Sequence, residues 1–263
     1  MRIARFVADS EVGYGLVEGL ADDGMPGPET VILGIDGHPV GELKPSGVVY
    51  RFADVRLLAP ILPSKVVAVG RNYAAHAAEM GGAVPAEPLI FLKPSTAIIG
   101  PNDSIVYPAA TNEVSYEAEL AVVIGRLCRD VPVERVHEVI LGYTCANDLT
   151  ARDLQRTDGQ WTRAKGFDTF CPLGPWIETD LDPSDLAIGS KVNGEVRQDG
   201  RTSQMVNDVP RLVSWISEVM TLLPGDVILT GTPAGVGPIL PGQTVEVTIE
   251  GIGTLRNPVV TRG

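Results

Sequence analysis

The stretch VSYEAELAVVIG, residues 114–125, places two glutamates directly before a run of apolar residues. Side chains alternate between the two faces of a β-strand, so Glu117 and Glu119 would project from the same face. An apolar run of this kind is typical of a buried strand, and two like charges in a semi-buried site repel each other unless a cation is present. The stretch therefore predicts a cation site, with a solvated sheet face that carries two glutamates as the alternative.

A third carboxylate is expected to join this pair. LGYTCAND, residues 141–148, reads as another strand that ends at Asp148, where the backbone is about to leave the sheet. Three carboxylates as ligands favour a hard cation such as Mg²⁺ or Mn²⁺ over zinc or copper. Such an ion would keep about three of its six octahedral positions for water or substrate.

A short helix is predicted directly after Asp148. In TARD, residues 150–153, Thr150 stands at the expected cap and Asp153 follows three residues later, which resembles a capping box. Arg152 and Gln155 are also three residues apart, so their side chains would share one face of this helix. The helix would therefore present both side chains beside the third carboxylate.

The composition excludes several classes of function. The chain of 263 residues carries 33 acidic and 21 basic residues, a net charge of -12, which is the wrong sign for a nucleic-acid partner. Its three cysteines show no CxxC spacing, which argues against a disulfide framework and a structural zinc site. The amino terminus lacks an apolar leader, and no apolar run approaches the ~20 residues that cross a bilayer. We therefore expect a cytoplasmic protein with no membrane partner.

The order of apolar runs and turns predicts an α+β fold with mostly antiparallel or mixed sheets and few helices. Residues 1–61 read as a small β-rich domain, and a proline-containing segment separates it from a main domain, residues 62–263. No sustained alternation of strand and helix occurs, which disfavours a Rossmann or barrel architecture. Helices are expected at 132–141 and 207–223, and the Asn193–Gly194 pair predicts a type I′ hairpin.

One more short helix attracts attention because of its histidine. GRNYAAHAAEMGG, residues 70–82, is closed by two glycines and contains one of only three histidines in the chain. His76 and Glu79 stand three residues apart and would share one face. Isolated helices of fewer than ~12 residues are marginal in water, so this lid helix, residues 72–80, is predicted to be mobile. His38 and His137 have no comparable partner and are expected at the surface.

Seven motifs together resemble the fumarylacetoacetate hydrolase family, especially its acylpyruvate hydrolase, oxaloacetate decarboxylase and isomerase branches. They run in family order over about three quarters of the chain. They are VGRNYAAHAAEM, FLKP, YEAELAVVIG, GYTCANDLTARDLQ, WTRAKGFDTFCPLGP, VNGEVRQDGRTSQM and LTGTPAGVG. The resemblance implies a β-sandwich roll, and the first sixty residues resemble the small amino-terminal domain of many members.

The resemblance also implies roles for particular residues. Metal ligands of the family, which bind Mg²⁺ or Mn²⁺, match Glu117, Glu119 and Asp148. Its active-site lysine matches Lys165, and its lid dyad matches His76 and Glu79. Positions that line the substrate pocket match Arg71, Arg152, Gln155 and Thr232. Members of the family are commonly dimeric, so a homodimer is expected.

The reaction stays open among three alternatives. The first is hydrolysis or decarboxylation of a carbon-carbon bond in a small 2-oxo acid of the acylpyruvate, fumarylpyruvate or oxaloacetate type, with His76 as the base. The second is the isomerisation of 2-hydroxyhepta-2,4-diene-1,7-dioate in aromatic catabolism, for which His76 would matter less. The third is a metal-binding member that has lost turnover.

Overall fold

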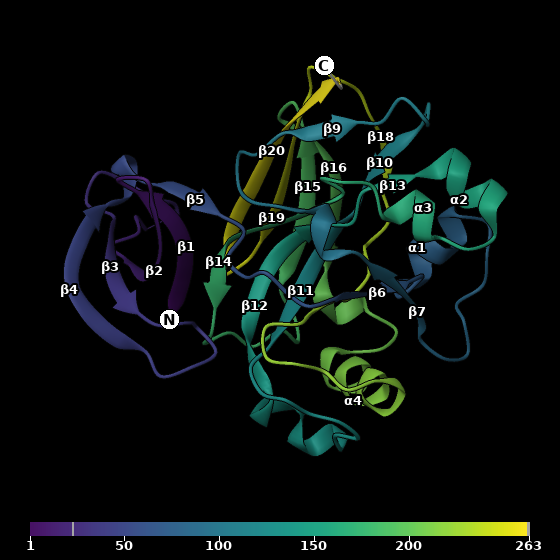
Figure 1. The fold of residues 1–263 in the computed structure, drawn as a ribbon. Helices are drawn as coiled ribbons and strands as arrows, with labels where there is room; N and C mark the ends of the chain where they lie inside the picture. The colour runs from purple at the N-terminus through teal and green to yellow at the C-terminus, as the bar shows by residue number, and fades with distance from the viewer. Residues whose placement is uncertain (23, 262–263) are drawn as a thin grey trace.

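The computed structural model describes residues 1–22 and 24–261, and within them the strands form three sheets (Figure 1). The largest sheet has twelve strands, and the others have five and three. Most strand pairs are antiparallel, with parallel pairs at only three places among the described residues. This mixed, β-rich architecture with short helices confirms the predicted fold class.

The first sixty residues form one end of the twelve-stranded sheet. Figure 1 shows these strands to the left of the central ones. Their bounds are β1 (Arg2–Ala8), β2 (Glu11–Glu18), β3 (Val31–Asp36), β4 (Lys44–Arg51) and β5 (Arg56–Leu58). Strand β1 also pairs with β14 (Cys171–Glu178), so the sheet continues into the rest of the chain. The boundary near residue 62 stays a prediction.

The centre of the same sheet carries the most buried strands. The order from β14 onward is β12, β11, β17, β6 and β7, and β8 pairs with β14. Every residue of β11 is buried between its antiparallel neighbours β12 and β17, as its apolar run predicts. The bounds are β6 (Val66–Gly70), β7 (Leu89–Lys93), β8 (Ile98–Ile99), β11 (Ala118–Ile124), β12 (Ile140–Asn147) and β17 (Val227–Leu229).

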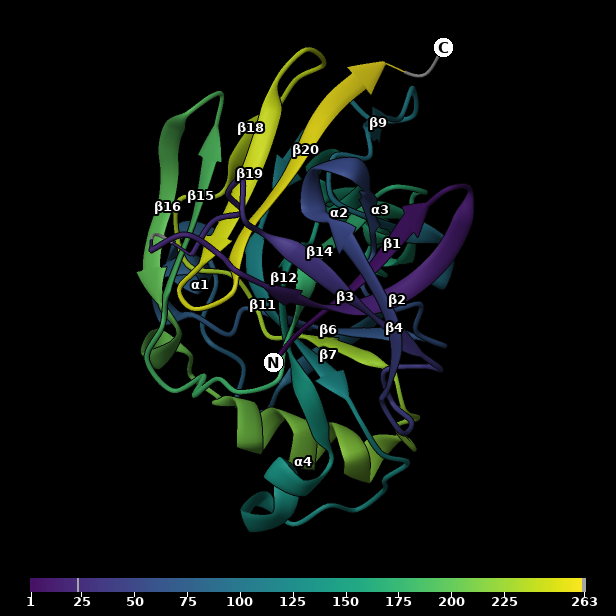
Figure 2. The same cartoon turned by 90° about the vertical axis from the view of Figure 1, so that its left-hand side faces the viewer.

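Two smaller sheets complete the fold, the three-stranded one labelled in Figure 1 and the five-stranded one in Figure 2. The five-stranded sheet contains β16 (Glu195–Arg201), β15 (Ala187–Val192), β19 (Thr244–Ile249), β20 (Gly253–Thr261) and β9 (Ile105–Tyr107) in that order. The three-stranded sheet contains β13 (Thr150–Ala151), β10 (Val114–Tyr116) and β18 (Gly237–Ile239). Asn193 and Gly194 both have positive φ between β15 and β16, which confirms the predicted hairpin.

The α-helices of the described residues are α1 (Ala74–Glu79), α2 (Arg152–Asp158), α3 (Thr162–Lys165) and α4 (Val209–Val219). None of them is long and apolar enough to span a membrane. The carboxylate of Asp208 caps α4 by accepting from the Arg211 N–H at 2.9 Å. The helix expected at 132–141 is instead a 3₁₀ turn, Val133–Glu138. Only Val136 of this turn is buried, so the segment lacks the packed stripe that stabilises an α-helix.

Two local predictions around the carboxylates are wrong. Thr150 does not cap α2, because it belongs to β13, and its hydroxyl donates to the Asp148 carbonyl at 3.0 Å. The strand expected to run through Glu117 is interrupted there, because the chain leaves the three-stranded sheet after Tyr116 and enters the twelve-stranded sheet at Ala118. The Glu117 N–H donates to the Asn147 side chain at 2.9 Å and thus makes no ladder bond.

Candidate metal centre and active site

The junction between two sheets brings three carboxylates together. Glu117 lies between β10 and β11, Glu119 lies on β11, and Asp148 follows the end of β12. The Asp148 N–H donates to the Glu117 carbonyl at 2.9 Å, which joins the two segments directly. One ligand oxygen of each carboxylate lies within 4.8 Å of the others, and all three residues are buried. The residues predicted as metal ligands are therefore close enough to hold a single ion.

Three buried cations surround these carboxylates. Lys165 Nζ donates to Glu117 Oε2 at 2.8 Å and to Asp148 Oδ2 at 2.6 Å. Arg152 Nη2 donates to Glu117 Oε1 at 2.5 Å, and Lys93 Nζ donates to Asp148 Oδ1 at 2.5 Å. No side chain in these ion pairs is more than 5% exposed. The cluster is thus held by charge pairs from β7, α2 and α3, which water does not screen.

The surroundings of Glu117 and Glu119 shift the pKa values of the two carboxyl groups in opposite directions. Burial alone would raise the pKa of Glu117, but the Lys165 ammonium and the Arg152 guanidinium outweigh it and hold this pKa far below its usual range. Burial raises the pKa of Glu119 well above its usual value, and the charges of Asp148 and Glu117 raise it further. Glu119 accepts from the Gly231 N–H at 2.7 Å. An additional positive charge beside these groups would relieve the repulsion that raises the pKa of Glu119.

The donor set fits a hard divalent cation. All three donors are carboxylate oxygens, which Mg²⁺ and Mn²⁺ prefer, and they share one buried site on three separate backbone positions. The like charges of Glu119 and its neighbours disfavour ionisation without a cation, as the pKa shift of Glu119 indicates. The site is therefore suited to hold such an ion.

A cavity of about 240 Å³ opens beside the carboxylates. It collects residues from β6, α1, α2 and α3, which Figure 1 shows on the right of the molecule. Eight predicted site residues line it, namely Arg71, His76, Glu117, Glu119, Arg152, Gln155, Lys165 and Thr232. Asp148 and Glu79 are not part of this lining, but they contact the lining residues Lys165 and His76. The fold thus brings the predicted residues together, while their individual roles stay predictions.

Helix α1 places the histidine at the wall of this cavity. His76 is buried, and its Nδ1 lies 3.3 Å from Glu79 Oε2. Glu79 in turn accepts from the Gly235 N–H, at 3.2 Å for Oε1 and 3.3 Å for Oε2. Because Nδ1 faces Glu79, the second ring nitrogen, Nε2, is left to interact with a ligand. The chain of contacts therefore fixes the orientation of the imidazole.

The base of α1 is anchored by a buried asparagine. Asn72 Nδ2 donates to the carbonyls of Asn207 at 2.9 Å and Thr230 at 2.8 Å, and its Oδ1 accepts from the Asn207 N–H at 2.9 Å. Tyr73 adds a β-bridge to Met205. The start of the lid helix is therefore fixed to the segment that precedes α4.

Sequence reasoning missed two buried residues of the site. Lys93 forms an ion pair with Asp148. A sequence signal existed, because Lys93 ends the apolar strand LIFLK of β7, and a buried lysine is rarely left unpaired. Gln198 Nε2 donates to Thr232 Oγ1 at 2.7 Å, and its Oε1 accepts from the Ala118 N–H at 3.0 Å. No local pattern in the polar strand β16 indicates this role.

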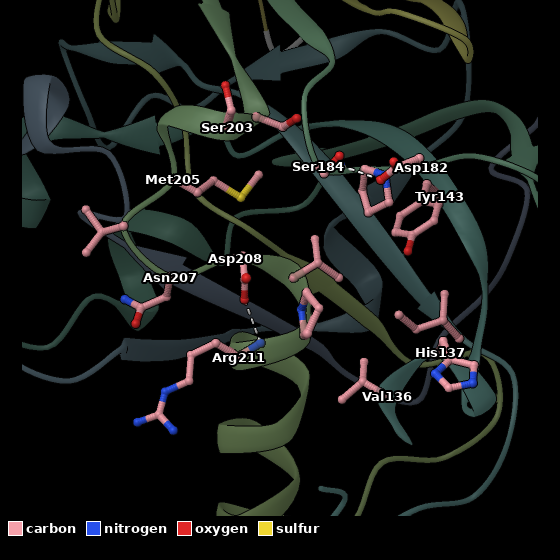
Figure 3. Close-up of a pocket in the computed structure, with 16 residues that line it drawn as sticks. Val136, His137, Tyr143, Asp182, Ser184, Ser203, Met205, Asn207, Asp208 and Arg211 are labelled. Carbon is pink, nitrogen blue, oxygen red and sulfur yellow. Dashed lines mark hydrogen bonds between the residues drawn. The ribbon is translucent and has the colours of Figure 1, made fainter. Parts of the chain in front are cut away.

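A second cavity, of about 650 Å³, lies at the start of α4 (Figure 3). Its walls include Tyr143, Met205 and Val136, with Asp182 and Asp208 as acidic groups. The one group of side chains that could hold a metal ion within the described residues is the carboxylate group, which does not line this cavity. Its larger volume therefore does not make it the better candidate for chemistry.

Comparisons with known families cover nearly the whole chain. A family model described as "Fumarylacetoacetate (FAA) hydrolase C-terminal" matches residues 65–260. A second model, described as "Rv2993c-like, N-terminal", matches residues 1–60. The first match contains all the residues of the cavity and the carboxylate group.

Individual relatives are similar over most or all of the chain. The crystal structure of 5-carboxymethyl-2-hydroxymuconate delta-isomerase from Mycobacterium smegmatis is 58% identical, with a TM-score of 0.92 and 100% of both chains covered. That of 2-hydroxyhepta-2,4-diene-1,7-dioate isomerase from Mycobacterium marinum is 55% identical, with a TM-score of 0.92 and coverage of 100% and 99%. The mitochondrial oxaloacetate tautomerase Fahd2a of Rattus norvegicus is 44% identical over 79% of this chain and 70% of its own.

Proposed function

The chain belongs to the fumarylacetoacetate hydrolase family, and we propose that it is an isomerase, dependent on Mg²⁺ or Mn²⁺, that shifts a double bond in a 2-hydroxy-dienoic diacid. The observation that carries this proposal is the buried group of Glu117, Glu119 and Asp148 beside a cavity that His76 also lines. The names of two full-length relatives, both isomerases, support isomerisation over hydrolysis.

The carboxylates would hold the ion, and the cations would orient the carboxylates. Glu117, Glu119 and Asp148 are the proposed ligands. When bound, the ion supplies a positive charge that a carboxylate and a neighbouring oxygen of the substrate can share. Lys165 and Arg152 keep Glu117 ionised and fix its two oxygens by hydrogen bonds. Lys93 fixes one oxygen of Asp148 by a hydrogen bond.

The isomerisation itself moves protons and breaks no carbon-carbon bond. The 2-hydroxyl of the diene loses a proton, the oxygen becomes a carbonyl, and a carbon at the far end of the diene gains a proton. His76 can assist this transfer, because Glu79 holds its ring through Nδ1 at the wall of the cavity, and water can carry the same proton when the imidazole is absent. Arg152 and Gln155, which are joined by a 2.9 Å hydrogen bond, line the cavity for substrate contact.

A carbon-carbon hydrolase or decarboxylase of small 2-oxo acids is the second candidate. The contact between His76 and Glu79, supported by Gly235, favours it, because an oriented imidazole is also what activation of an attacking water requires. Hydrolysis consumes that water, whereas isomerisation does not. The two candidates therefore differ in how much they depend on His76.

Turnover of a substrate panel tests the proposal. The panel contains 2-hydroxyhepta-2,4-diene-1,7-dioate, oxaloacetate, acetylpyruvate and fumarylpyruvate, each with Mg²⁺, with Mn²⁺ and with a chelator. We expect a metal-dependent change in ultraviolet absorbance with the diene, and proton NMR of the product should show an intact carbon chain. Glu117→Ala should abolish turnover. Cleaved products would favour the second candidate, and no metal-dependent turnover of any substrate would favour a non-catalytic member.

The variant His76→Ala separates the two reactions. For isomerisation we expect a loss of about 10- to 100-fold, far smaller than the effect of metal removal. For hydrolysis the loss should reach about 10⁴-fold, because the water would lose its base. His137→Ala is the matched control, since His137 is exposed and lies outside the cavity around the carboxylates.

A further inference from the structure

Arg71 follows the end of β6 in an unusual backbone conformation. Its φ is +58°, in the left-handed region that residues other than glycine seldom adopt. This conformation places the side chain at the wall of the 240 Å³ cavity that also contains Glu117 and Lys165. A strained position of about 1–3 kcal/mol persists only where the surrounding structure holds it. Arg71 is therefore a residue whose placement needs an explanation.

The guanidinium of Arg71 lies against the end of the lid helix. A Cβ added to Gly82 would meet Arg71 Nη1 at 2.8 Å and Cζ at 3.0 Å, so a glycine is what leaves room for the guanidinium. Gly82 closes α1, because its N–H donates to the Ala77 carbonyl at 3.0 Å. The guanidinium thus spans from the end of β6 to the helix that carries His76.

Charge distinguishes Arg71 from the other cations of the cavity. Lys165 and Arg152 are paired with the carboxylate group, and Arg156 is paired with Glu113 at 2.5 Å. For Arg71 no carboxylate lies within ion-pair distance anywhere in residues 1–22 and 24–261. Arg71 is only partly exposed, so its guanidinium is incompletely hydrated in a cavity that it shares with the candidate ion site. An anionic group of a ligand is the partner that this position lacks.

We propose that Arg71 is the specificity-determining residue that binds the second carboxylate of a diacid, at the end remote from the ion. This inference rests on the proposed function, in which the first carboxylate of the substrate lies beside Glu117 and Glu119. A guanidinium binds a carboxylate through two parallel hydrogen bonds, which gives direction as well as charge. The cavity is smaller than the ~300–1,000 Å³ of pockets for drug-sized ligands, so a short diacid suits it.

The contact of the Arg71 guanidinium with Gly82 links ligand binding to the lid helix. A carboxylate bound to Arg71 holds the guanidinium in place against the last turn of α1, and the same helix carries His76. A diacid should therefore restrict α1 more than a monoacid of the same length. Gly82→Ala displaces the guanidinium without removing its charge, and this variant should share part of the defect of an Arg71 variant.

Binding of two matched ligands tests the proposal. The probes are 2-oxoadipate and 2-oxohexanoate, which have the same number of carbons and differ in the terminal carboxylate. Isothermal titration with Mg²⁺ measures both on the native protein, on Arg71→Met and on Arg71→Lys. We expect Arg71→Met to weaken 2-oxoadipate about 10- to 100-fold, as for a lost charge-assisted hydrogen bond, and 2-oxohexanoate less than 3-fold. Arg71→Lys should retain part of the preference.

Controls keep the result interpretable. Arg163→Met removes a cation that is 58% exposed and already paired with Asp158, so neither ligand should change. Equal weakening of both ligands by Arg71→Met would overturn the proposal, and so would a selective loss caused by Arg156→Met instead. If Arg71→Met fails to fold, the same two ligands are titrated into the native protein and into Gly82→Ala. A native protein that binds 2-oxoadipate and 2-oxohexanoate equally contradicts the proposal.

The outcome is separable from that of the proposed function. Absence of isomerase turnover with a retained, Arg71-dependent preference for 2-oxoadipate would leave this assignment in place and remove the reaction. Turnover of the diene without a preference for 2-oxoadipate would support the proposed reaction and remove the assignment of Arg71.

Discussion

The carboxylate group and the lid helix face the same cavity but are built in opposite ways. Glu117, Glu119 and Asp148 are at most 5% exposed and are held by ion pairs and hydrogen bonds from several elements. Helix α1 has only six residues, and its Glu79 side chain is 36% exposed. It is held mainly at its two ends, by Asn72 and through Glu79. One side of the cavity is therefore held by buried charges from several elements, and the other has fewer contacts, most of them at the two ends of α1.

This difference predicts two kinds of defect. Buried charges that lose a partner destabilise the whole fold, because the remaining charge cannot be hydrated. A short helix that contributes little buried surface can be altered with little effect on global stability, although a residue it carries has a large effect on rate. Variants on the two sides should therefore separate stability from turnover.

Asp148→Asn should have the largest effect. The substitution removes one proposed ion ligand and leaves the ammonium groups of Lys93 and Lys165 without their shared partner. We expect turnover to fall to background and the free energy of unfolding to fall by about 3–5 kcal/mol. The diene assay with Mn²⁺ measures turnover, and urea unfolding measures the free energy of unfolding. Asp158→Asn is the control, because the cation paired with Asp158, Arg163, is 58% exposed and can be hydrated when the pair is lost. Native stability in Asp148→Asn would contradict a rigid, charge-coupled cluster.

His76→Ala should show the opposite pattern. The imidazole contacts Glu79 alone among the hydrogen-bond partners found in the described part of the chain, so its removal strands no buried charge. We expect a rate loss of about 10- to 100-fold for isomerisation, with the free energy of unfolding within about 1 kcal/mol of the native value. Thermal unfolding and the diene assay on the same preparation check both. A strongly destabilised variant would mean that α1 is part of the rigid core.

Asn72→Ala tests the attachment of the lid helix. The buried amide makes four hydrogen bonds, three with Asn207 and one with Thr230, and its loss leaves two backbone carbonyls and one backbone N–H without this partner. We expect a loss of about 1–3 kcal/mol in the free energy of unfolding and a raised KM. Hydrogen exchange should accelerate in α1 more than in β11. Uniform acceleration over both elements would show that the two sides of the cavity are not independent.

Local patterns predicted much of the fold because the information is local. The Asn193–Gly194 turn and the helix predicted within 207–223, which is α4, follow from neighbouring residues alone. The predicted cap at Thr150 is wrong because of a contact distant in sequence. Strand β13, which contains Thr150, pairs with β10 and so becomes part of a sheet. Tertiary pairing overrides a local capping preference of about 1 kcal/mol.

The site was predictable where residue type and spacing carry the chemistry. Two glutamates two residues apart and an aspartate at a strand end converge as expected, although Glu117 lies at a break between strands. Lys93 and Gln198 reach the site across 55 and 80 residues of sequence, from Asp148 and Ala118. Such pairings depend on sheet order, which no single segment specifies.

Asp153→Asn should have the smallest effect, because Asp153 is a partly exposed residue of α2 beside the buried Arg152. Asp153 is the residue next to Arg152 on α2, and its carboxylate accepts from the Thr111 hydroxyl and, at 3.0 Å, from the Asn112 N–H. Burial would raise the pKa of Asp153, but these hydrogen bonds outweigh it and lower the pKa. We expect the free energy of unfolding to fall by about 0.5–1 kcal/mol, which corresponds to about 2–4 °C in Tm. The loss is small because the carboxylate is close to solvent.

The pH dependence of this small loss has a definite sign. A carboxylate with a lowered pKa in the folded state stabilises the fold at pH values above its unfolded pKa of about 3.9. This stabilisation disappears as the pH falls through the folded pKa, because the carboxylate is then protonated in both states. The difference in Tm between native protein and Asp153→Asn should therefore be constant from pH 5 to 7 and should shrink below about pH 4. A difference that instead grows on acidification would show that the hydrogen bonds favour the protonated carboxyl, and α2 would then be anchored by other contacts than those of Asp153.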